Sequence, residues 1–235
     1  MDDKTRLKYW FPLLEKAGLP IPKTIMVEAS EEEIVTIYNS FDTGKLGKGF
    51  DSLAEKIKIA ADTIGYPCFL RTDHFSGKHN WDKTCFLQSA DDIKQHVFEI
   101  AYFWECVNMF GAPCDTWVVR EFLPTIPHGV CQNYGNMPIC KEFRFFVKDG
   151  TIKCFHPYWP LQALNDGAPQ YNGNFDYEAF CTLENEAEVS ELVTAAAQAV
   201  AGEWSIDVLE TKNGWYITDM AEAHKSYHWE PCDCR

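Results

Sequence analysis

The distribution of apolar and polar positions predicts short helices and hairpins along the whole chain. Apolar residues recur every three to four positions, as in amphipathic helices, over 4–17, 52–64, 89–110 and 185–202. A further helix is expected at 30–39. Runs rich in β-branched and aromatic residues predict strands at 24–27, 67–72, 84–87, 117–122, 141–147, 151–156, 205–210 and 215–219. No internal repeat or low-complexity tract interrupts this order.

Local signals mark helix starts and loops. An acidic residue three positions after Ser30, Ser89 and Asn185 predicts a capped helix N-terminus at each. The segment 41–50 holds three glycines and two lysines but lacks the Gly-Lys-Ser/Thr ending of a P-loop, which favours a flexible connector over a phosphate loop. The segment 158–181 is expected to be irregular, and long loops in compact domains usually act as lids or binding loops.

Composition narrows the class of protein. The chain has 235 residues, 46% hydrophobic and 24% charged, which is typical of a globular protein. A net charge of −14 argues against general nucleic-acid binding, because such binding depends on neutralising phosphates. No apolar run approaches the roughly 20 residues of a membrane span, and the N-terminus has no apolar signal-peptide core. We therefore expect a cytoplasmic protein without membrane contact.

The ten cysteines are not expected to form a disulfide framework, because no secretion signal is present. Several lie in apolar strand-like runs, where a free thiol packs as a small hydrophobe. Cys232 and Cys234 form a C-x-C near His228 at the C-terminal end. A metal or redox role stays open there beside a simple frayed tail.

The stretch Trp204–Glu222 carries the clearest candidate chemistry. Its two strand-like runs flank an Asn-Gly pair that ends at Gly214. A two-residue turn would send Asp207 and Asp219 to opposite faces, whereas a three-residue turn would place them directly opposite each other. Opposed like charges are unfavourable, so the second register predicts a cation between them, with Mg²⁺ as the natural candidate. The alternative is a solvated hairpin with two unrelated aspartates.

Basic side chains mark two other hairpins. The turn after Arg71 offers the backbone N–H groups, hydroxyl and ammonium of Ser76, Gly77 and Lys78, a set that suits a phosphate. Arg144 alternates with phenylalanines that point to the other face of its strand. An arginine in so apolar a strand usually has an anionic partner, either a structural carboxylate or a ligand.

Taken in order, these pieces resemble the ATP-grasp superfamily over residues 18–223. The resemblance is carried by the Gly-x-Pro-x-Pro-x-Thr pattern at 18–24, the flap strand 67–71 with 76–78, the adenine-hinge pattern at 118–123, the Glu-x-Arg strand 142–147, and Ser205–Val208 followed by Asp219. It implies an α+β ATP-grasp fold in which two α+β lobes clasp ATP between antiparallel sheets. The implied parts are an N-terminal helical and strand region (1–65), a small lobe with the phosphate flap (66–116) and a large lobe with the metal-binding hairpin (117–235).

Several positions depart from the family pattern. Arg71 stands where most members have Lys, which resembles a divergent, often virus-encoded branch. Asp219 replaces the common Glu. Ala221 stands where a metal-binding Asn is usual, so either Glu222 substitutes or one ligand is missing. His128 lies where a ribose-binding acid often falls.

The resemblance implies that ATP drives the ligation of a carboxylate to an amine through an acyl phosphate. Arg71, Lys78 and Arg144 would act in catalysis on the phosphates, because phosphoryl transfer depends on positioning and charge neutralisation. The implied Mg²⁺ ligands are Asp207, Asp219 and Glu222. The other residues implied to contact ATP are Ser76, Gly77, Arg120, Glu121, Phe122, Leu123 and His128.

The implied substrates are a small-molecule or peptide carboxylate and an amine, which the sequence does not name. Two other interpretations stay open. One is an ATP-binding module without ligase activity that binds a protein partner, since the resemblance includes a cell-division protein that assists assembly of a translation factor. The other is a small-molecule kinase on the same fold. The N-terminal region 1–65 is short for the extra lobe of many members, so substrate binding can also depend on a homodimer or a protein partner.

Overall fold

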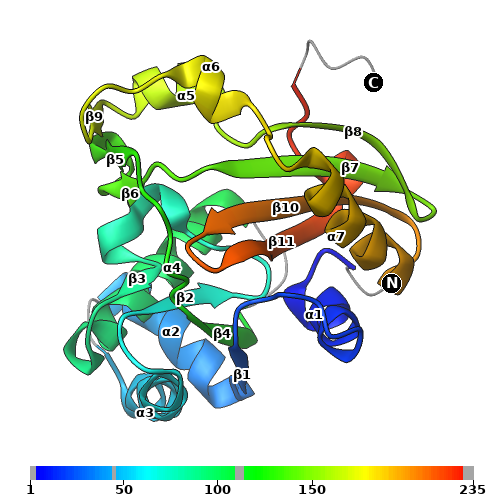
Figure 1. The fold of residues 1–235 in the computed structure, drawn as a ribbon. Coiled ribbons are helices and arrows are strands. Elements are labelled where there is room, and N and C mark those ends of the chain that lie inside the picture. The colour runs from blue at the N-terminus through cyan, green and yellow to red at the C-terminus, as the bar shows by residue number, and fades with distance from the viewer. Residues whose placement is uncertain (1–3, 44–45, 109–113, 230–235) are drawn as a thin grey trace. The chain divides into compact units, whose positions relative to one another are not determined.

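The computed structural model describes residues 4–43, 46–108 and 114–229 (Figure 1). Residue contacts group the chain into two compact units. Unit 1 comprises Met1–Pro22, Leu123–Gln132 and Pro138–Arg235, and unit 2 comprises Lys23–Phe122 and Asn133–Met137. The three functional lobes expected from the sequence stay a prediction. Crossing a membrane would need a longer and more apolar helix than any that the described residues form.

Unit 2 is built on a four-stranded antiparallel sheet in the order β1-β4-β2-β3. Its strands are β1 (Thr24–Glu28), β2 (Cys68–Thr72), β3 (Phe86–Leu87) and β4 (Thr116–Glu121). The helices of this unit are α2 (Glu31–Thr43), α3 (Lys48–Ile64) and α4 (Ile93–Asn108) (Figure 1). Their apolar faces form one core with the sheet.

Strand alternation divides the side chains of this sheet between two faces. Leu70, Trp117 and Val119 are fully buried in the core with the helices. Successive residues of a strand point to opposite faces. Arg71 and Arg120, which occupy the alternate positions of β2 and β4, therefore point away from that core.

Two of the three predicted helix caps are confirmed. The Ser30 backbone N–H donates to Glu33 Oε2 at 2.7 Å, and the Glu33 N–H donates to Ser30 Oγ at 3.3 Å. Ser89 forms the same kind of box with Asp92. The cap expected at Asn185 is wrong. Its φ of −102° and ψ of 43° are not the extended backbone of an N-cap, and its side chain makes no capping hydrogen bond.

The segment 41–50 is mostly helical and is not the flexible connector that its glycines predicted. α2 continues to Thr43, α3 begins at Lys48, and residues 44–45 lie outside the described chain. A Cβ at Gly49 would lie 2.5 Å from Thr36 Oγ1. Glycine is therefore required for the close approach of α2 and α3, and not for backbone freedom.

Unit 1 holds a second antiparallel sheet in the order β11-β10-β7-β8. Its strands are β7 (Glu142–Lys148), β8 (Thr151–Pro157), β10 (Glu203–Thr211) and β11 (Gly214–Glu222). The helices that pack on this sheet are α1 (Leu7–Lys16) and α7 (Glu186–Ala199). A smaller sheet orders β6 (Met137–Pro138), β5 (Gly129–Cys131) and β9 (Pro169–Tyr171).

The segment 158–181 contains secondary structure where the sequence predicted none. It forms α5 (Leu161–Asp166), β9 and α6 (Tyr177–Cys181). These elements are too short to show a periodic pattern. The Asp176 carboxylate caps α6 by accepting from the N–H groups of Glu178 and Ala179 at 3.0 and 3.1 Å. A lid role for this segment stays a prediction.

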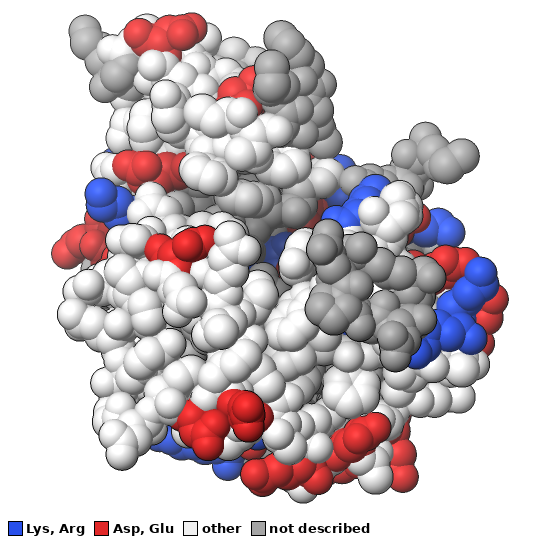
Figure 2. Space-filling model, turned by 90° about the horizontal axis from the view of Figure 1, so that it is seen from above, with Lys and Arg blue, Asp and Glu red and all other residues white. Residues whose placement is uncertain are grey.

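The acidic surface agrees with the composition. Asp and Glu side chains are scattered over the face shown in Figure 2, as expected from the net charge of −14.

Most of the described cysteines are free thiols, as the sequence predicted. Burial raises the pKa of the thiols of Cys68, Cys85, Cys114 and Cys140 to about 12, so these side chains pack as small apolar groups. The exception is Cys154, which is disulfide-bonded. A single disulfide needs only two adjacent thiols, and the spacing of cysteines along the sequence does not reveal that adjacency. Cys232 and Cys234 lie outside the described residues.

Candidate functional site

Four polar side chains form a cross-strand row on one face of the unit 1 sheet. The register pairs His156 with Arg144, Arg144 with Asp207, and Asp207 with Asp219. Residues paired directly across antiparallel strands point to the same face. β8, β7, β10 and β11 thus each contribute one member of what we call the polar row.

A β-bulge sets Asp207 opposite Asp219. The pairing is the one that a three-residue turn predicts, but the turn is different, because Thr211 pairs with Gly214 across a two-residue loop. That register alone would pair Asp207 with Thr218. The bulge adds Thr218 as an extra residue, and its Oγ1 donates to the Asp207 backbone O at 3.3 Å.

Arg144 and Asp207 bind each other through a two-pronged ion pair. Arg144 Nε donates to Asp207 Oδ1 at 2.7 Å, and Nη2 donates to Oδ2 at 2.8 Å. The side chains are 16% and 5% exposed, respectively. Burial alone would lower the pKa of Arg144, but the adjoining Asp207 carboxylate raises it well above its usual value. The guanidinium also lies over the Tyr158 ring, 4.9 Å from its centroid.

The other acids of the hairpin differ in orientation. Asp219 is half-buried, and its Oδ1 accepts from the Met220 N–H at 3.1 Å. Glu222 pairs with Trp204, which places it out of phase with Asp219 and on the other face of the strand. Glu222 also forms an ion pair with Lys225 at 2.9 Å. The register therefore brings Asp207 and Asp219 together and leaves Glu222 apart from them.

His156 is a member of the row that sequence reasoning missed. Its ring is buried, and Nδ1 lies 2.8 Å from the Pro157 backbone O, so Nδ1 carries the proton and Nε2 is an acceptor. Burial lowers the pKa of His156 to about 4, and the positive charge of Arg144 acts in the same direction. The ring is neutral at pH 7. Aligning the two strands of the predicted β7–β8 hairpin would have revealed its place opposite Arg144.

Unit 2 carries two buried arginines on the sheet face opposite its core. Arg71 and Arg120 are 5% and 4% exposed. Arg71 Nε donates to the Thr72 backbone O at 3.0 Å, and Arg120 Nε donates to Thr24 Oγ1 at 3.1 Å. Buried arginines usually accompany anions, so this face is suited to an anionic ligand.

The predicted flap joins the same face. It does not turn tightly but contains a 3₁₀ helix at Lys78–Lys83, preceded by Gly77 with φ +66°. Thr84 Oγ1 donates to the Gly77 backbone O at 2.6 Å. The positive charges of Lys78 and Arg71 both oppose the burial that raises the pKa of the Cys85 thiol. The two cations therefore lie near the same place.

A glycine turn from residues 133–137 supports the flap. The Asp82 N–H donates to the Gly135 backbone O at 3.1 Å, and Asn136 Nδ2 donates to Asp82 Oδ2 at 2.6 Å. A Cβ at Gly135 would lie 2.7 Å from the backbone N of Trp81. The flap is thus packed against a second segment of unit 2, which nothing in the local sequence indicated.

The residues of the predicted adenine hinge end β4. Glu121 is half-buried, and its N–H donates to the Lys23 backbone O at 2.9 Å. The Phe122 ring packs on Phe86 with centroids 5.0 Å apart. Leu123, which begins the next segment of unit 1, is 5% exposed.

His128, predicted near the ribose, lies in an aromatic cluster of unit 1. Its ring contacts Phe180 and Phe175 edge-on, with centroids 5.2 and 6.0 Å apart. Its backbone N–H donates to the Ile139 O at 2.8 Å. The aromatic packing accounts for the ring position without a ligand.

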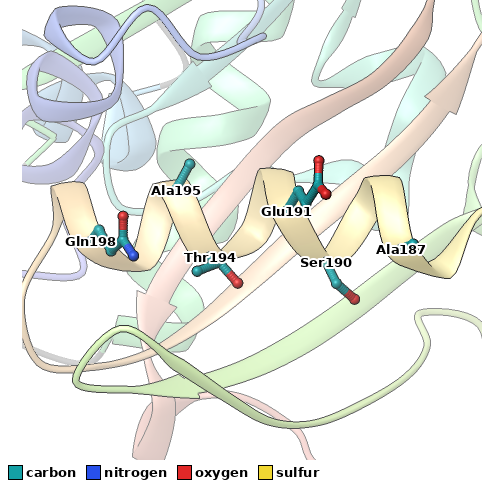
Figure 3. Close-up of a pocket in the computed structure, with 6 residues that line it drawn as sticks. All are labelled: Ala187, Ser190, Glu191, Thr194, Ala195 and Gln198. Carbon is teal, nitrogen blue, oxygen red and sulfur yellow. The ribbon is translucent and has the colours of Figure 1, made fainter.

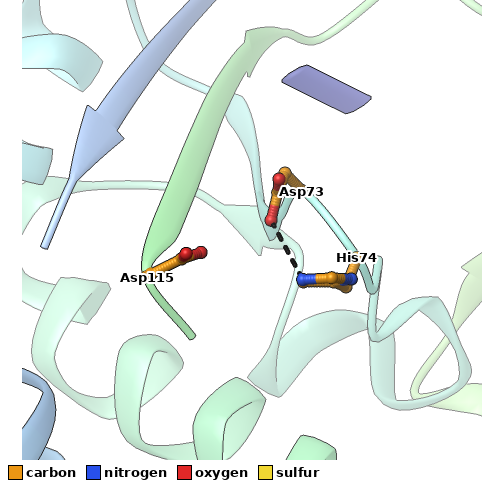
Figure 4. A group of neighbouring side chains, drawn as sticks. All are labelled: Asp73, His74 and Asp115. Atoms are coloured by element: carbon orange, nitrogen blue, oxygen red, sulfur yellow. Dashed lines mark ion pairs between the residues drawn. The ribbon is translucent and has the colours of Figure 1, made fainter. Parts of the chain in front are cut away.

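Two other features include none of the predicted residues. Ligand atoms of Asp73, His74 and Asp115 lie within 4.8 Å of one another, and His74 pairs with Asp73 at 3.8 Å (Figure 4). That ion pair gives the group a structural role, and we derive no metal from it. A shallow depression of about 310 Å³ lies along α7 (Figure 3). It is lined by Ala187, Ser190, Glu191, Thr194, Ala195 and Gln198.

Comparisons with known proteins identify the same architecture. Residues 48–230 match a family model described as an ATP-grasp domain, the third family of its clade. C-terminally truncated Cdc123 from Schizosaccharomyces pombe matches with a TM-score of 0.59 and 14% identity, over 93% of this chain and 83% of that one. No curated protein matches the chain.

Two enzymes share the fold over part of their length. N5-carboxyaminoimidazole synthase from Aspergillus clavatus matches with a TM-score of 0.54 and 11% identity, over 96% of this chain and 46% of that one. Biotin carboxylase from Campylobacter jejuni matches with a TM-score of 0.54 and 13% identity, over 93% of this chain and 40% of that one. The chain thus spans less than half of either enzyme, and these likenesses show the fold alone. The α+β fold that the resemblance implied is confirmed.

Proposed function

The chain belongs to the matched family of ATP-grasp domains, and on this premise we propose that it is an ATP-dependent carboxylate–amine ligase. The observation that carries the proposal is the polar row. A β-bulge brings Asp207 opposite Asp219 and beside Arg144. Two carboxylates and a guanidinium on one sheet face suit an Mg²⁺-bound triphosphate, whose transfer chemistry depends on charge neutralisation.

The donor set fits Mg²⁺, which prefers carboxylate oxygens. Each oxygen of an ionised carboxylate has two acceptor sites, so Asp207 keeps capacity for a metal while it binds Arg144. Asp219 would supply the second carboxylate. Glu222 is omitted from the proposed set because it points to the other face and pairs with Lys225. The ion, when bound, would neutralise charge on the phosphate oxygens.

We propose that positive groups of unit 2 also contact the triphosphate. Arg71 and Lys78 would neutralise its oxygens, supported by their common electrostatic effect at Cys85. Ser76 and the backbone N–H of Gly77 would add hydrogen bonds from the flap. Arg120 lies on the same sheet face as Arg71 and would add a further positive charge.

The base and sugar contacts follow from the family pattern. Glu121 would bind the adenine together with the backbone of Phe122 and Leu123. His128 would face the ribose only by leaving part of its aromatic contact with Phe180. Its contribution is therefore expected to be small.

The proposed reaction has two steps. A substrate carboxylate oxygen attacks the γ-phosphorus, the bond to the β-phosphate bridging oxygen breaks, and an acyl phosphate and ADP result. An amine then attacks the acyl carbon, phosphate leaves, the amine loses a proton, and an amide remains. Arg144 would stabilise the phosphoryl oxygens in both steps, since its ion pair with Asp207 fixes its position and its charge.

A second candidate is an ATP-binding module that binds a protein partner without turnover. Ala221 favours it, because the residue opposite Ser205 has no side-chain oxygen for a metal. The two functions differ in product. A ligase releases ADP in the presence of an acid and an amine, whereas the module binds ATP without releasing ADP.

Calorimetric titration with Mg²⁺ and ATP tests the proposal. We expect Mg²⁺-dependent binding to the wild-type protein and loss of that binding in Asp207→Asn, which removes a ligand charge. Asp42→Asn, an exposed position on α2, is the matched control and should bind as the wild type does. Absence of binding to folded wild-type protein would contradict both candidates, and ADP release during a screen of acids with amines would favour the ligase.

A further inference from the structure

The segment Ser226–Trp229, which we call the strap, crosses the sheet face that carries the polar row. The Ser226 hydroxyl is hydrogen-bonded to that of Ser205 on β10. The His228 ring stacks on Phe146 of β7 with centroids 4.0 Å apart. Ser205 and Phe146 are paired in the sheet, immediately beside the polar row. The strap therefore lies on the site face and not at the edge of the unit.

The strap also contacts two members of the polar row. The Trp229 ring stacks on His156 with centroids 5.1 Å apart, and its backbone N–H donates to His156 Nε2 at 3.5 Å. Arg144 Nη1 donates to the Tyr227 backbone O at 3.4 Å. The strap thus occupies hydrogen-bonding positions that face a ligand on this side of the sheet.

The contact between Arg144 and Tyr227 is the weakest part of the arginine's surroundings. The bonds from Arg144 to Asp207 are 2.7 and 2.8 Å long, as expected for charged partners. The bond to Tyr227 is longer, at 3.4 Å, and its acceptor is neutral. A phosphate oxygen in place of this carbonyl would form a charge-assisted bond, so an anion replaces the strap more readily than it replaces Asp207.

Two aromatic side chains of the strap are held loosely. The Tyr227 side chain is 60% exposed and contributes little packing. The indole N–H of Trp229 is buried and has no hydrogen-bond partner among the described residues. A buried donor without a partner disfavours the docked position, because undocking returns that group to water.

We propose that the strap is an autoinhibitory contact that competes with the phosphate groups of a nucleotide for Arg144. Nucleotide binding moves the strap off the polar row, and strap docking lowers nucleotide affinity. This inference rests on the proposed ATP binding and adds to it a regulatory element within unit 1. Competition equal to one neutral hydrogen bond weakens binding by about twofold to tenfold.

The test compares Mg²⁺·ATP affinity by calorimetry in the wild type and in the double variant His228→Ala/Trp229→Ala. This variant removes the stacking on Phe146 and His156 and leaves Arg144 and both aspartates in place. We expect its dissociation constant to be about twofold to tenfold lower. Ser226→Ala is a milder variant with the same expected direction. Tyr102→Ala, an exposed aromatic position on α4, is the control and should bind as the wild type does.

Hydrogen exchange of 226–229 supplies the second readout and should become faster when Mg²⁺·ATP is added to the wild type. Equal or weaker binding by the folded strap variants, with strap exchange unchanged by nucleotide, would overturn the inference while leaving ATP binding intact. Binding by the double variant alone would support it strongly. If neither protein binds, the proposed function and the strap fall together.

Discussion

Arg144 is surrounded by the Asp207 carboxylate, the Tyr158 ring and the Tyr227 carbonyl. The alternation of its strand predicts an anionic partner, and the structure identifies that partner as Asp207. The sequence singled out both residues but did not pair them, because the contact joins strands that are 63 residues apart. His156 was missed for a related reason, since its role depends on the register of a hairpin.

Arg144→Ala should strongly destabilise the fold. It leaves the Asp207 carboxylate buried without its cation, so the free energy of unfolding should fall by about 3–5 kcal/mol in a urea titration at pH 7. The double variant Arg144→Met/Asp207→Leu removes both charges and should recover most of the loss. Equal stability of the wild type and Arg144→Ala would show that the ion pair does not hold this face together.

Glu33 should give stability that depends on pH. Burial raises its pKa, but Lys56, Ser30 and Ser52 more than offset this and lower it from 4.5 to about 2. Because the folded-state pKa lies below the unfolded one, the stabilisation is present above pH 4.5 and is lost as pH falls from 4.5 toward 2. Glu33→Gln should cost about 1–3 kcal/mol at pH 7 and progressively less below pH 4.5, measured by urea unfolding at each pH. A difference independent of pH would contradict the assignment.

Elements with a strong local pattern were predicted best. The β7–β8 and β10–β11 hairpins, α1, α3 and the caps at Ser30 and Ser89 follow from alternation, helical spacing and capping residues. The bulge at Thr218 did not follow, because a bulge depends on pairing with the neighbouring strand and has no signature of its own here. The short α5, β9 and α6 are stabilised by tertiary contacts that sequence periodicity does not reveal.

The turn at Gly135 should control the order of the flap. A Cβ there would approach the Trp81 backbone N to 2.7 Å, in addition to the cost of its φ of +65°. Gly18→Ala is the matched control, since Gly18 has a φ of +70° and no atom within 4 Å of an added Cβ. Gly18→Ala should cost about 1–2 kcal/mol. Gly135→Ala should cost more and should speed hydrogen exchange over 78–84. Equal costs and unchanged exchange would contradict a supporting role for this turn.

At the scale of the whole chain, the order of motifs predicted the ATP-grasp fold although each motif alone was weak. The family match and the two antiparallel sheets confirm that prediction. Substrates were out of reach, because a shared fold does not determine function. The placement of Gly135 beside the flap depends on contacts distant in sequence, which no local pattern encodes.

The net charge of −14 should make the fold more stable in salt, because screening reduces self-repulsion. Raising NaCl from about 0.01 M to about 0.15 M shortens the screening length from roughly 30 to 8 Å. We expect the melting temperature to rise by about 2–4 °C, the shift that 1 kcal/mol produces in a chain of this size. Calorimetric melting would check this. A fall would mean that exposed ion pairs such as Lys148–Glu203 outweigh the repulsion.

The central claim is that Asp207 and Asp219 of the polar row hold the metal of a bound nucleotide. Electron paramagnetic resonance with Mn²⁺ in place of Mg²⁺ tests it directly, since free and protein-bound Mn²⁺ give different signals. With ATP present, the wild type should bind Mn²⁺, and Asp207→Asn and Asp219→Asn should each lose most of that bound signal, whereas Glu222→Gln should keep it. Retention of wild-type Mn²⁺ binding in both aspartate variants would contradict the account.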